Sequence, residues 1–481
     1  MSTMKNKISN KIKTLLILGV ISMSISCNES FIDLAPISNA NVGAFYKTQS
    51  DFETAIVAVY AEWQNLFSTQ WTEFNEFRGD TYTHVQYSYR EISENQFLLN
   101  TTSPMWNRLY SIIAKANILL DKIDAVEKFD EATKNRIKAE ARFFRAEAYF
   151  ALVRFFGAVP LVVHETTSEE ALNIGRTPVL DIFKVIEEDY RFAVDNLPPT
   201  VSDANYGRIT KYGAEGELAR VYITLSGKVY NTNRWTDAKP LLEDILDNSP
   251  YKFSASYKEI FASDGSNEKG KEIILSALFK AGGQGEVTEY QRQFVGPYWG
   301  YLTLFEDGVI ESYENGDLRK DVNILMSYVD IDGIQRNDPT NGKFNYGYDL
   351  SSRTSGMDFP ILRYTDIYLL YAETLSEIAN GVPSQSLDIL NNVRNRAGLT
   401  SLTAMNVPNI AAFRLAMEKE RRSELMFECV RWFDMVRTGR AVDLLKAIGK
   451  NADDTWLLFP IPQIEIDKVG KDILPQNPGY N

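Results

Sequence analysis

Few residues in this chain could carry out nucleophilic, acid–base or metal chemistry. Its 481 residues include only two histidines, His84 and His164, and two cysteines, Cys27 and Cys429. This count excludes a histidine-rich zinc site, and the chain has neither a GxSxG nucleophile motif nor a glycine-rich phosphate loop. We therefore expect no enzyme, no cofactor and no metal site. A glycosidase that works with two carboxylates alone is the catalytic alternative.

Aromatic side chains in two segments without helical periodicity could instead bind a ligand. A sugar packs the apolar face of its ring on tyrosine or tryptophan, while amide and charged groups hold its hydroxyl groups. The candidate residues lie between Trp71 and Arg90 and between Tyr290 and Tyr301. They are Trp71, Asp80, Tyr82, Tyr87, Tyr89, Arg90, Tyr290, Arg292, Tyr298, Trp299 and Tyr301. The alternative for each aromatic residue is a place in the core.

Cys27 stands at the end of a leader that is typical of bacterial lipoproteins. The leader has a lysine-rich start, an apolar run from Leu15 to Met23 and small residues before the cysteine. That run is too short to span a bilayer. We expect residues 1–26 to be a signal peptide, Cys27 to be the lipid attachment site and residues 27–49 to form a tether. A soluble exported protein is the alternative, because Ser24 stands where such leaders usually carry leucine.

The charge balance and the cysteine count limit the partners of the chain. It carries 51 Lys+Arg against 64 Asp+Glu, a formal net charge of −13. Nucleic acid and anionic lipid are therefore not expected partners. With Cys27 occupied by lipid, Cys429 has no partner for a disulfide and is expected to be a buried, small apolar residue. No segment after the leader reaches the roughly 20 apolar residues of a membrane helix, so the lipid would be the only attachment.

Hydrophobic residues at helical spacing predict a mainly α fold. Ser50 and Glu53 predict a capping box at the start of the first helix, and Pro104 suits the first turn of the second. Small and aromatic residues recur across neighbouring helices, as in tetratricopeptide repeats. The predicted helices are 50–66, 104–123, 130–156, 177–197, 210–225, 235–247, 364–379, 384–396 and 409–437.

The order of these helices divides the chain into a scaffold and a loop-rich region. The helical-repeat scaffold covers about 50–248 and 361–456. Between them, about 249–360, the sequence is rich in Gly, Asn, Asp and Tyr and contains short β-like runs such as Glu272 to Phe279. The proline-rich residues 457–481 are expected to form an extended tail.

Charged residues recur near helical spacing between Glu420 and Arg440, beside bulky apolar ones. This pattern predicts one long helix whose salt-bridged edge docks on the preceding helix pair. We favour this architectural role over a catalytic one.

Several motifs, in order along the chain, resemble the SusD/RagB family of outer-membrane nutrient-binding lipoproteins. The resemblance covers nearly the whole chain after the leader, with one departure at Cys429, where glycine is commoner. The motifs are CNESFIDLAP at 27–36, AEARFFRAEAYFALVRFFGAVPLV at 139–162, GRITK at 207–211, ERRSELMFECVRWFDMVRTGR at 420–440, LFPIP at 458–462 and QNPGY at 476–480.

The resemblance implies a SusD-like fold, with four tetratricopeptide-like units on one side and a variable, loop-rich region on the other. It also implies a lipid-anchored position on the cell surface, at the outer membrane, beside a SusC-like TonB-dependent transporter. Such proteins pass a nutrient, most often a glycan or oligosaccharide, to the transporter without catalysis. A peptide ligand, as in RagB-type members, and a helical scaffold that binds only proteins are the alternatives.

Overall fold

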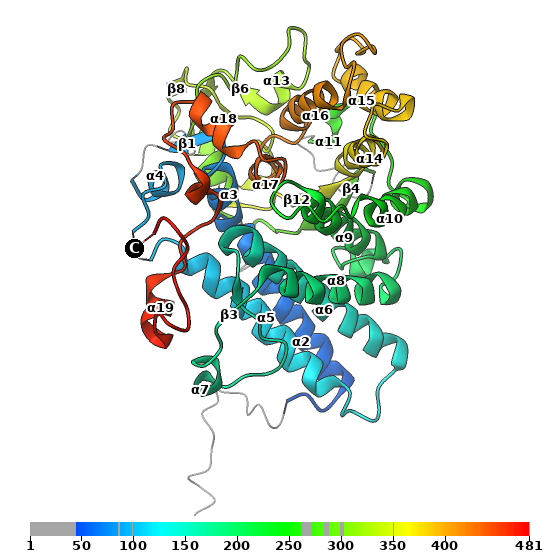
Figure 1. The fold of residues 1–481 in the computed structure, drawn as a ribbon, viewed down its shortest axis with the longest axis vertical. Helices are drawn as coiled ribbons and strands as arrows, with labels where there is room; N and C mark the ends of the chain where they lie inside the picture. The colour runs from blue at the N-terminus through cyan, green and yellow to red at the C-terminus, as the bar shows by residue number, and fades with distance from the viewer. Residues whose placement is uncertain are drawn as a thin grey trace, which may run out of the picture.

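The computed structural model shows a mainly helical protein with short two-stranded sheets (Figure 1). It describes residues 45–84, 87–98, 100–261, 271–282, 288–298, 303–349 and 351–480. The expected signal peptide, Cys27 and most of the tether therefore lie outside the described residues. Within the described ranges, no helix combines the length and the apolar composition that a membrane span requires.

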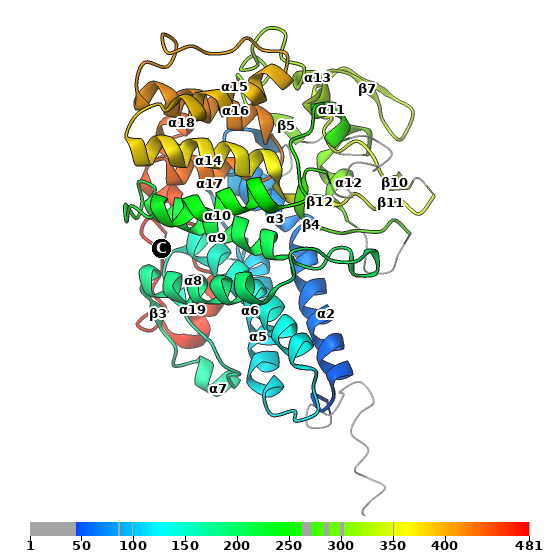
Figure 2. The same ribbon diagram turned by 90° about the vertical axis from the view of Figure 1, so that its right-hand side faces the viewer.

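Long helices stack side by side along one side of the molecule (Figure 2). Each packs on its neighbours in the chain, and α10 packs on α14 across the loop-rich region. This is the repeat packing that the sequence predicts, and the mainly α fold class is confirmed. The helices are α2 (Gln49–Leu66), α5 (Ser103–Ile123), α6 (Glu131–Phe156), α8 (Val179–Asn196), α9 (Lys211–Ser226), α10 (Trp235–Asn248), α14 (Tyr364–Ala379), α15 (Ser384–Arg396) and α16 (Ile410–Glu424).

Capping side chains set the helix starts, with one correction at α2. Thr48, not Ser50, is its N-cap: the Thr48 hydroxyl accepts from the backbone N–H of Asp51, and the Asp51 carboxylate accepts from the backbone N–H of Thr48. The predicted capping box of Ser50 and Glu53 is wrong, because Thr48 and Asp51 form the capping box two residues earlier. Asp130 caps α6, which lies within the predicted range 130–156, by accepting from the backbone N–H of Thr133 at 2.8 Å.

The long helix predicted over 409–437 is interrupted. It ends with α16, and α17 (Arg431–Arg437) follows after a break in which Phe427 and Cys429 have φ of 69° and 60°. These left-handed conformations end the helical hydrogen-bond ladder. Tertiary contacts hold the break: the ring of Phe427 stacks on Tyr82 at 4.9 Å, and the backbone N–H of Cys429 donates to Glu76 Oε1 at 2.8 Å. Cys429 is a buried free thiol, as predicted.

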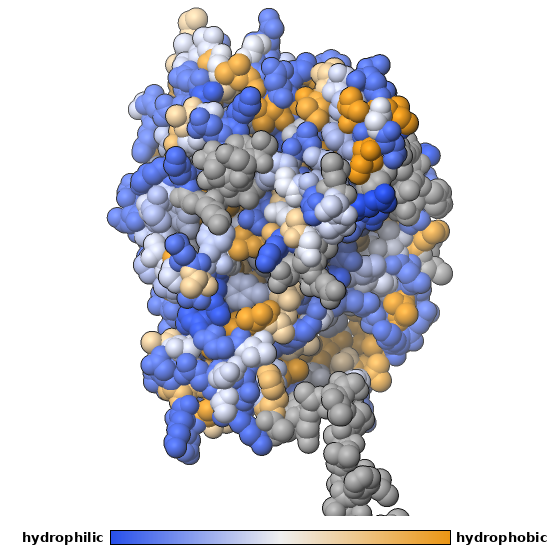
Figure 3. Space-filling model, turned by 180° about the vertical axis from the view of Figure 1, so that it is seen from behind, coloured by the Kyte–Doolittle hydropathy of each residue, from blue (hydrophilic) through white to orange (hydrophobic). Residues whose placement is uncertain are grey.

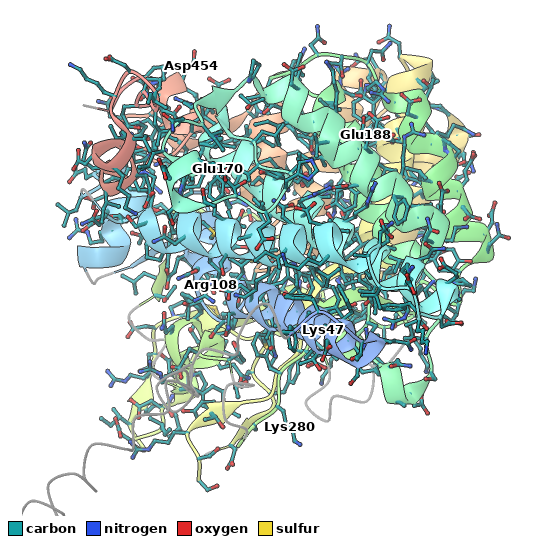
Figure 4. The ribbon with its side chains drawn as sticks, turned by 90° about the horizontal axis from the view of Figure 1, so that it is seen from below. Lys47, Arg108, Glu170, Glu188, Lys280 and Asp454 are labelled. Atoms are coloured by element: carbon teal, nitrogen blue, oxygen red, sulfur yellow. The ribbon has the colours of Figure 1, made fainter. Side chains whose placement is uncertain are left out.

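The loop-rich region consists of short strands and short helices. Its longest strands, β4 (Ile273–Ala277) and β12 (Phe359–Arg363), pair antiparallel where the region meets the helices. Figure 4 shows the region, marked by Lys280, on one side of α2, and the helices that carry Glu170 and Glu188 on the other. The remaining elements are α11 (Tyr257–Ile260), α12 (Tyr290–Phe294), η3 (Gly296–Tyr298), α13 (Lys320–Asn323), β6 (Ile324–Leu325), β7 (Tyr328–Val329), β8 (Gln335–Arg336), β9 (Thr340–Asn341), β10 (Tyr348–Asp349) and β11 (Thr354–Ser355).

Short elements complete the molecule, and several fall where no helix was predicted. The C-terminal segment is not wholly extended, because α19 (Gln463–Val469) begins directly after Pro462, whose fixed φ suits a helix start. Helices α3 and α4 lie within the first aromatic segment. The short elements are α3 (Gln70–Glu76), β1 (Tyr82–His84), α4 (Tyr87–Ser93), β2 (Val159–Pro160), α7 (Ser168–Ala171), β3 (Arg176–Thr177), η2 (Asp203–Asn205), β5 (Thr303–Phe305), α18 (Ala441–Ala447) and η5 (Asp454–Leu457).

A buried ionic cluster joins the loop-rich region to the scaffold. Arg363 of β12 contacts Glu272 and Glu428 at 2.7 Å each and Glu424 at 3.2 Å. Arg319 contacts Glu420 at 2.6 Å and Glu424 at 3.3 Å. We use "ionic cluster" for these residues together with two further cations. The full set is Glu272, Arg319, Lys343, Arg363, Arg396, Glu420, Glu424 and Glu428.

Other charged residues of the segment 420–440 dock this segment on helix α14. Arg421 reaches Asp366 at 2.6 Å, and Arg437 forms a two-point contact with Glu373 at 2.6 and 2.9 Å. The predicted salt-bridged edge on the preceding helix pair is therefore present. It faces the interior and not the solvent, which the spacing alone did not indicate.

Candidate ligand-binding site

Two tyrosine rings stack on each other in the loop-rich region. The rings of Tyr298 and Tyr348 have centroids 4.3 Å apart and an interplanar angle of 19°. Both residues are half-buried. We call this pair the tyrosine platform. Strands β10 and β11 lie at the right-hand edge of Figure 2, on the side that Figure 3 views; hydrophilic residues cover most of that side, with apolar patches between them.

Local packing fixes both halves of the platform. Tyr298 ends η3, whose first residue, Gly296, donates its N–H to Thr340 Oγ1 at 3.0 Å. A Cβ on Gly296 would lie 2.4 Å from Cζ of Tyr328, so only glycine fits this approach. Tyr348 is held by the antiparallel pairing of β10 with β11. The two rings are thus positioned before any ligand arrives.

Gln291 ties the supporting loops together beneath the platform. Its side-chain amide donates to the carbonyl oxygens of Phe344, at 2.6 Å, and Tyr346, and its oxygen accepts from the hydroxyl of Ser355. One buried side chain therefore connects α12, the segment before β10, and β11. A fully satisfied buried network of this kind rigidifies its surroundings.

Charged groups surround the ring of Tyr348. Burial raises the pKa of Tyr348, the Glu289 carboxylate raises it further, and Arg292 and Arg353 lower it. The phenol therefore stays neutral at physiological pH. Its oxygen is buried and has no hydrogen-bond partner among the described residues. Arg292 pairs with Glu289, yet 48% of its side chain is exposed, so the pair can still contact a ligand.

Four of the candidate residues from the sequence are buried in the core. Asp80 forms a two-point contact with Arg431 at 2.9 and 2.7 Å. Trp71 lies in α3, not in a loop, and packs on Phe155 and Phe433. Their burial leaves no surface for a ligand, so we do not retain them in the site. The four residues are Trp71, Asp80, Tyr82 and Tyr290.

The other candidates divide between the site, the far surface and undescribed parts of the chain. Arg292 and Tyr298 belong to the platform region. Arg90 is exposed and pairs with Glu94, four residues on in the chain. The side chains of Tyr87 and Tyr89, and the whole of Trp299 and Tyr301, lie outside what the structure describes.

Sequence analysis missed Tyr348, Glu289 and Arg353. Tyr348 stands in a stretch rich in glycine and tyrosine, Tyr346-Gly347-Tyr348, within the region already recognised as loop-rich. That composition could have pointed to it. Its pairing with Tyr298, 50 positions away in the chain, is a tertiary contact with no trace in local periodicity.

Comparison with known proteins gives two family matches and many similar structures. Residues 290–480 match the model described as SusD family, and residues 30–223 match the model described as starch-binding associating with outer membrane. A SusD-like protein of Formosa agariphila is 24% identical over 95% of this chain and 96% of its own length.

Solved structures share the fold over most of the chain. A SusD homologue from Bacteroides thetaiotaomicron superposes with a TM-score of 0.78 at 22% identity, over 92% of this chain and 99% of its own. A laminarin-binding SusD-like protein superposes with a TM-score of 0.77 at 24% identity, over 90% of this chain and 100% of its own.

Proposed function

Because this chain belongs to the SusD/RagB family, we propose that it is a surface lipoprotein that binds a glycan at the tyrosine platform. The observation that carries the proposal is the stacked, half-buried pair of Tyr298 and Tyr348. Rings that are fixed in place and partly open to solvent offer the flat apolar surface on which a sugar ring packs. The family resemblance to a laminarin-binding protein supports a glucan as the first ligand class to test.

In this proposal the platform and its charged neighbours have separate roles. The exposed parts of the two rings take up the C–H face of a sugar residue. The Arg292, Arg353 and Glu289 side chains hydrogen-bond its hydroxyl groups. None of these contacts requires a bond to be broken, and we propose binding without catalysis. Preformed geometry limits the entropy cost of binding.

We further propose that a lipid on Cys27 anchors the protein to the outer membrane. Residues 27–49 would act as a tether that holds the body beside a SusC-like TonB-dependent transporter, to which the glycan is passed. The match to a family described as associating with the outer membrane supports this position. Tethering keeps the effective concentration of the binding protein at the transporter high.

Calorimetric titration of the mature, full-length protein tests the ligand proposal. The panel comprises laminarin, starch, xylan, mannan and mixed peptides. We expect one glycan to bind. The Tyr348→Ala variant should bind it about tenfold more weakly, because a sugar stacked on an aromatic ring contributes about 1 kcal/mol or more to the binding free energy. Binding of peptides alone would instead favour the RagB-type alternative. New reducing ends after incubation with the bound polymer would contradict the absence of catalysis.

Expression of tagged protein in its native cells tests the anchor and the partner. We expect the wild-type protein to fractionate with the outer membrane and to co-purify with a large barrel protein. Cys27→Ala should release the protein from the membrane and impair uptake while its glycan affinity in solution is unchanged. Normal uptake by the released variant would overturn the anchored model.

A further inference from the structure

A second pocket lies on the other side of the molecule. It is a cavity of about 350 Å³ between the loop after α4, residues 95–98, and the C-terminal segment around α19. Figure 2 marks the C-terminus at the left and labels β10 and β11 at the right, so the pocket and the tyrosine platform are distant from each other. Neither the platform nor the ionic cluster contributes a residue to it.

The chemistry of the pocket wall is unusual for this chain. Charged residues make up 24% of the sequence, yet none of the residues that line the pocket is charged. The wall combines side-chain amides with aromatic and aliphatic groups. Amides both donate and accept hydrogen bonds without a net charge. A neutral, hydroxyl-bearing molecule matches such a wall better than an ion does, because no lining residue offers an ion a counter-charge.

Hydrogen bonds hold the wall in place. Gln476 accepts from the backbone N–H of Ile461 at 2.7 Å and donates to the Ile461 carbonyl at 2.8 Å. The Tyr480 hydroxyl donates to Asn95 Oδ1 at 2.8 Å, which joins the two segments across the pocket. The Phe97 ring packs in T-shaped arrangements with the rings of Phe459 and Tyr480. The cavity is therefore a preformed feature of the fold.

Other groups on the wall stay open to a ligand. Gln96 is exposed, and its side-chain amide has no hydrogen-bond partner among the described residues. Gln463 uses its amide N–H on Asp467, and no described residue donates to its side-chain carbonyl oxygen. Leu98, with 57% of its surface exposed, and the half-buried Phe97 supply apolar area beside these amides.

We propose that this pocket is a second binding site, specific for a neutral sugar residue. Phe97 and Leu98 pack against the apolar face of the sugar, and the amides of Gln96 and Gln463 exchange hydrogen bonds with its hydroxyl groups. The ligand class is the same as in the proposed function, but the residues are separate. The site can therefore be tested without the platform.

Binding of simple sugars to the mature, full-length protein tests the proposal. The probes are glucose, galactose, mannose and N-acetylglucosamine, with glucuronate as the anionic counterpart. Saturation-transfer NMR detects their binding, and crystals soaked with each sugar show where it binds. We expect at least one neutral sugar to occupy the pocket and glucuronate to be excluded. Gln96→Ala combined with Gln463→Ala should weaken that binding about fivefold or more, as expected for the loss of two hydrogen bonds.

The Tyr348→Ala variant separates the two sites. Sugar binding at the pocket should be unchanged in Tyr348→Ala and weakened about fivefold or more in the Gln96/Gln463 double variant, while binding of the long glycan at the platform should show the opposite dependence. If no neutral sugar occupies the pocket, or if Tyr348→Ala removes all sugar binding, the second site does not exist. If only the Gln96/Gln463 variant loses all binding, the platform assignment fails and the pocket stands.

Discussion

The ionic cluster and the tyrosine platform use the same residue types in opposite ways. Both combine arginines, carboxylates and aromatic neighbours. In the ionic cluster, each side chain of Arg319, Lys343 and Arg363 and of the carboxylates they contact is at most 5% exposed. At the platform, 48% of the Arg292 side chain and 37% of the Glu289 side chain are exposed. The charges of the cluster satisfy one another, whereas the platform keeps bonding capacity for a ligand.

This difference shows that dense charge is a poor guide to function in this protein. The segment 420–440 carries the most regular charge pattern, and its Glu420, Glu424 and Glu428 hold cations that come from the loop-rich region and from β12. Its role is to fix the loops relative to the helices. The platform comes from residues that show no helical or strand periodicity in the sequence.

The largest loss of folding stability is expected when the ionic cluster is broken at Glu424. Arg319, Arg363 and Arg396 all contact this carboxylate, and although burial raises its pKa, these cations and Lys343 lower it to about 2. Glu424→Gln keeps the volume but leaves buried positive charge uncompensated, so it should reduce the free energy of unfolding by about 3–5 kcal/mol. Urea unfolding followed by circular dichroism measures this difference.

The matched control is Glu94→Gln, which breaks the exposed pair with Arg90. It should change the free energy of unfolding by no more than about 0.5 kcal/mol. Equal losses in the two variants would show that the cluster carries no special share of the stability. Glycan affinity should be the same in both folded variants, since neither residue lies at the platform.

The pH dependence of stability should show a maximum near pH 4–5. Burial raises the pKa of Asp80, but Arg431 and Arg422 lower it to about 2, as the arginines do for Glu424. These carboxylates stabilise the fold above their unfolded pKa of about 4, and that stability is lost as pH falls through 2. Burial raises the pKa of Glu76 to about 7, so the folded state holds a proton that the unfolded state releases above about 4.5.

Stability should therefore decline again as pH rises from about 4.5 to 7, and the share of Glu76 in that decline is on the order of 3 kcal/mol. Urea unfolding at a series of pH values measures the curve. Glu76→Gln should flatten its alkaline side and leave the acid side unchanged. A wild-type curve that rises steadily from pH 4 to 8 would contradict the buried, protonated state of Glu76.

A smaller effect is expected at the platform, on the free energy of unfolding and not on ligand binding. Tyr348→Phe retains the stacked ring and removes a hydroxyl whose oxygen is buried without a partner among the described residues. Because that oxygen is not exposed to a ligand, glycan affinity should stay the same, while the free energy of unfolding should stay the same or rise by up to about 1 kcal/mol. Calorimetric titration and urea unfolding of one preparation give both numbers. A loss of stability would make the Tyr348 hydroxyl structural, and a loss of affinity would contradict its burial.

Local sequence features were sufficient to predict most of the long helices. The bounds of α14 and α15 agree with the predicted ranges 364–379 and 384–396 to the residue, because hydrophobic periodicity and terminal Pro or Asn residues act within a few positions. Helix α3 escaped prediction since it has only seven residues and no side-chain cap. Trp71 was therefore expected in a loop although it packs inside the core.

The candidate site depended on contacts that sequence periodicity does not report. Tyr298 was among the predicted residues, but its partner Tyr348 approaches through the β10–β11 pairing. Asp80 and Tyr82 were chosen for their residue types, and the structure places them against Arg431 and Phe427 of a segment more than 300 positions away. Contacts between residues far apart in the chain therefore determine whether a residue of a given type is buried or exposed.

The smallest effect concerns the break between α16 and α17, where Cys429 stands in a left-handed conformation with φ of 60°. A residue with a Cβ is strained there by about 1 kcal/mol or more, while glycine is not. Alanine keeps the strain and loses the buried sulfur atom; glycine loses the sulfur but relieves the strain. Cys429→Gly should therefore be more stable than Cys429→Ala by about 1 kcal/mol, the reverse of the order in helices and strands. Urea unfolding of the two variants decides the order. If alanine were the more stable, the left-handed conformation at Cys429 would carry little strain, and the contacts of Phe427 and of the Cys429 N–H would hold the break.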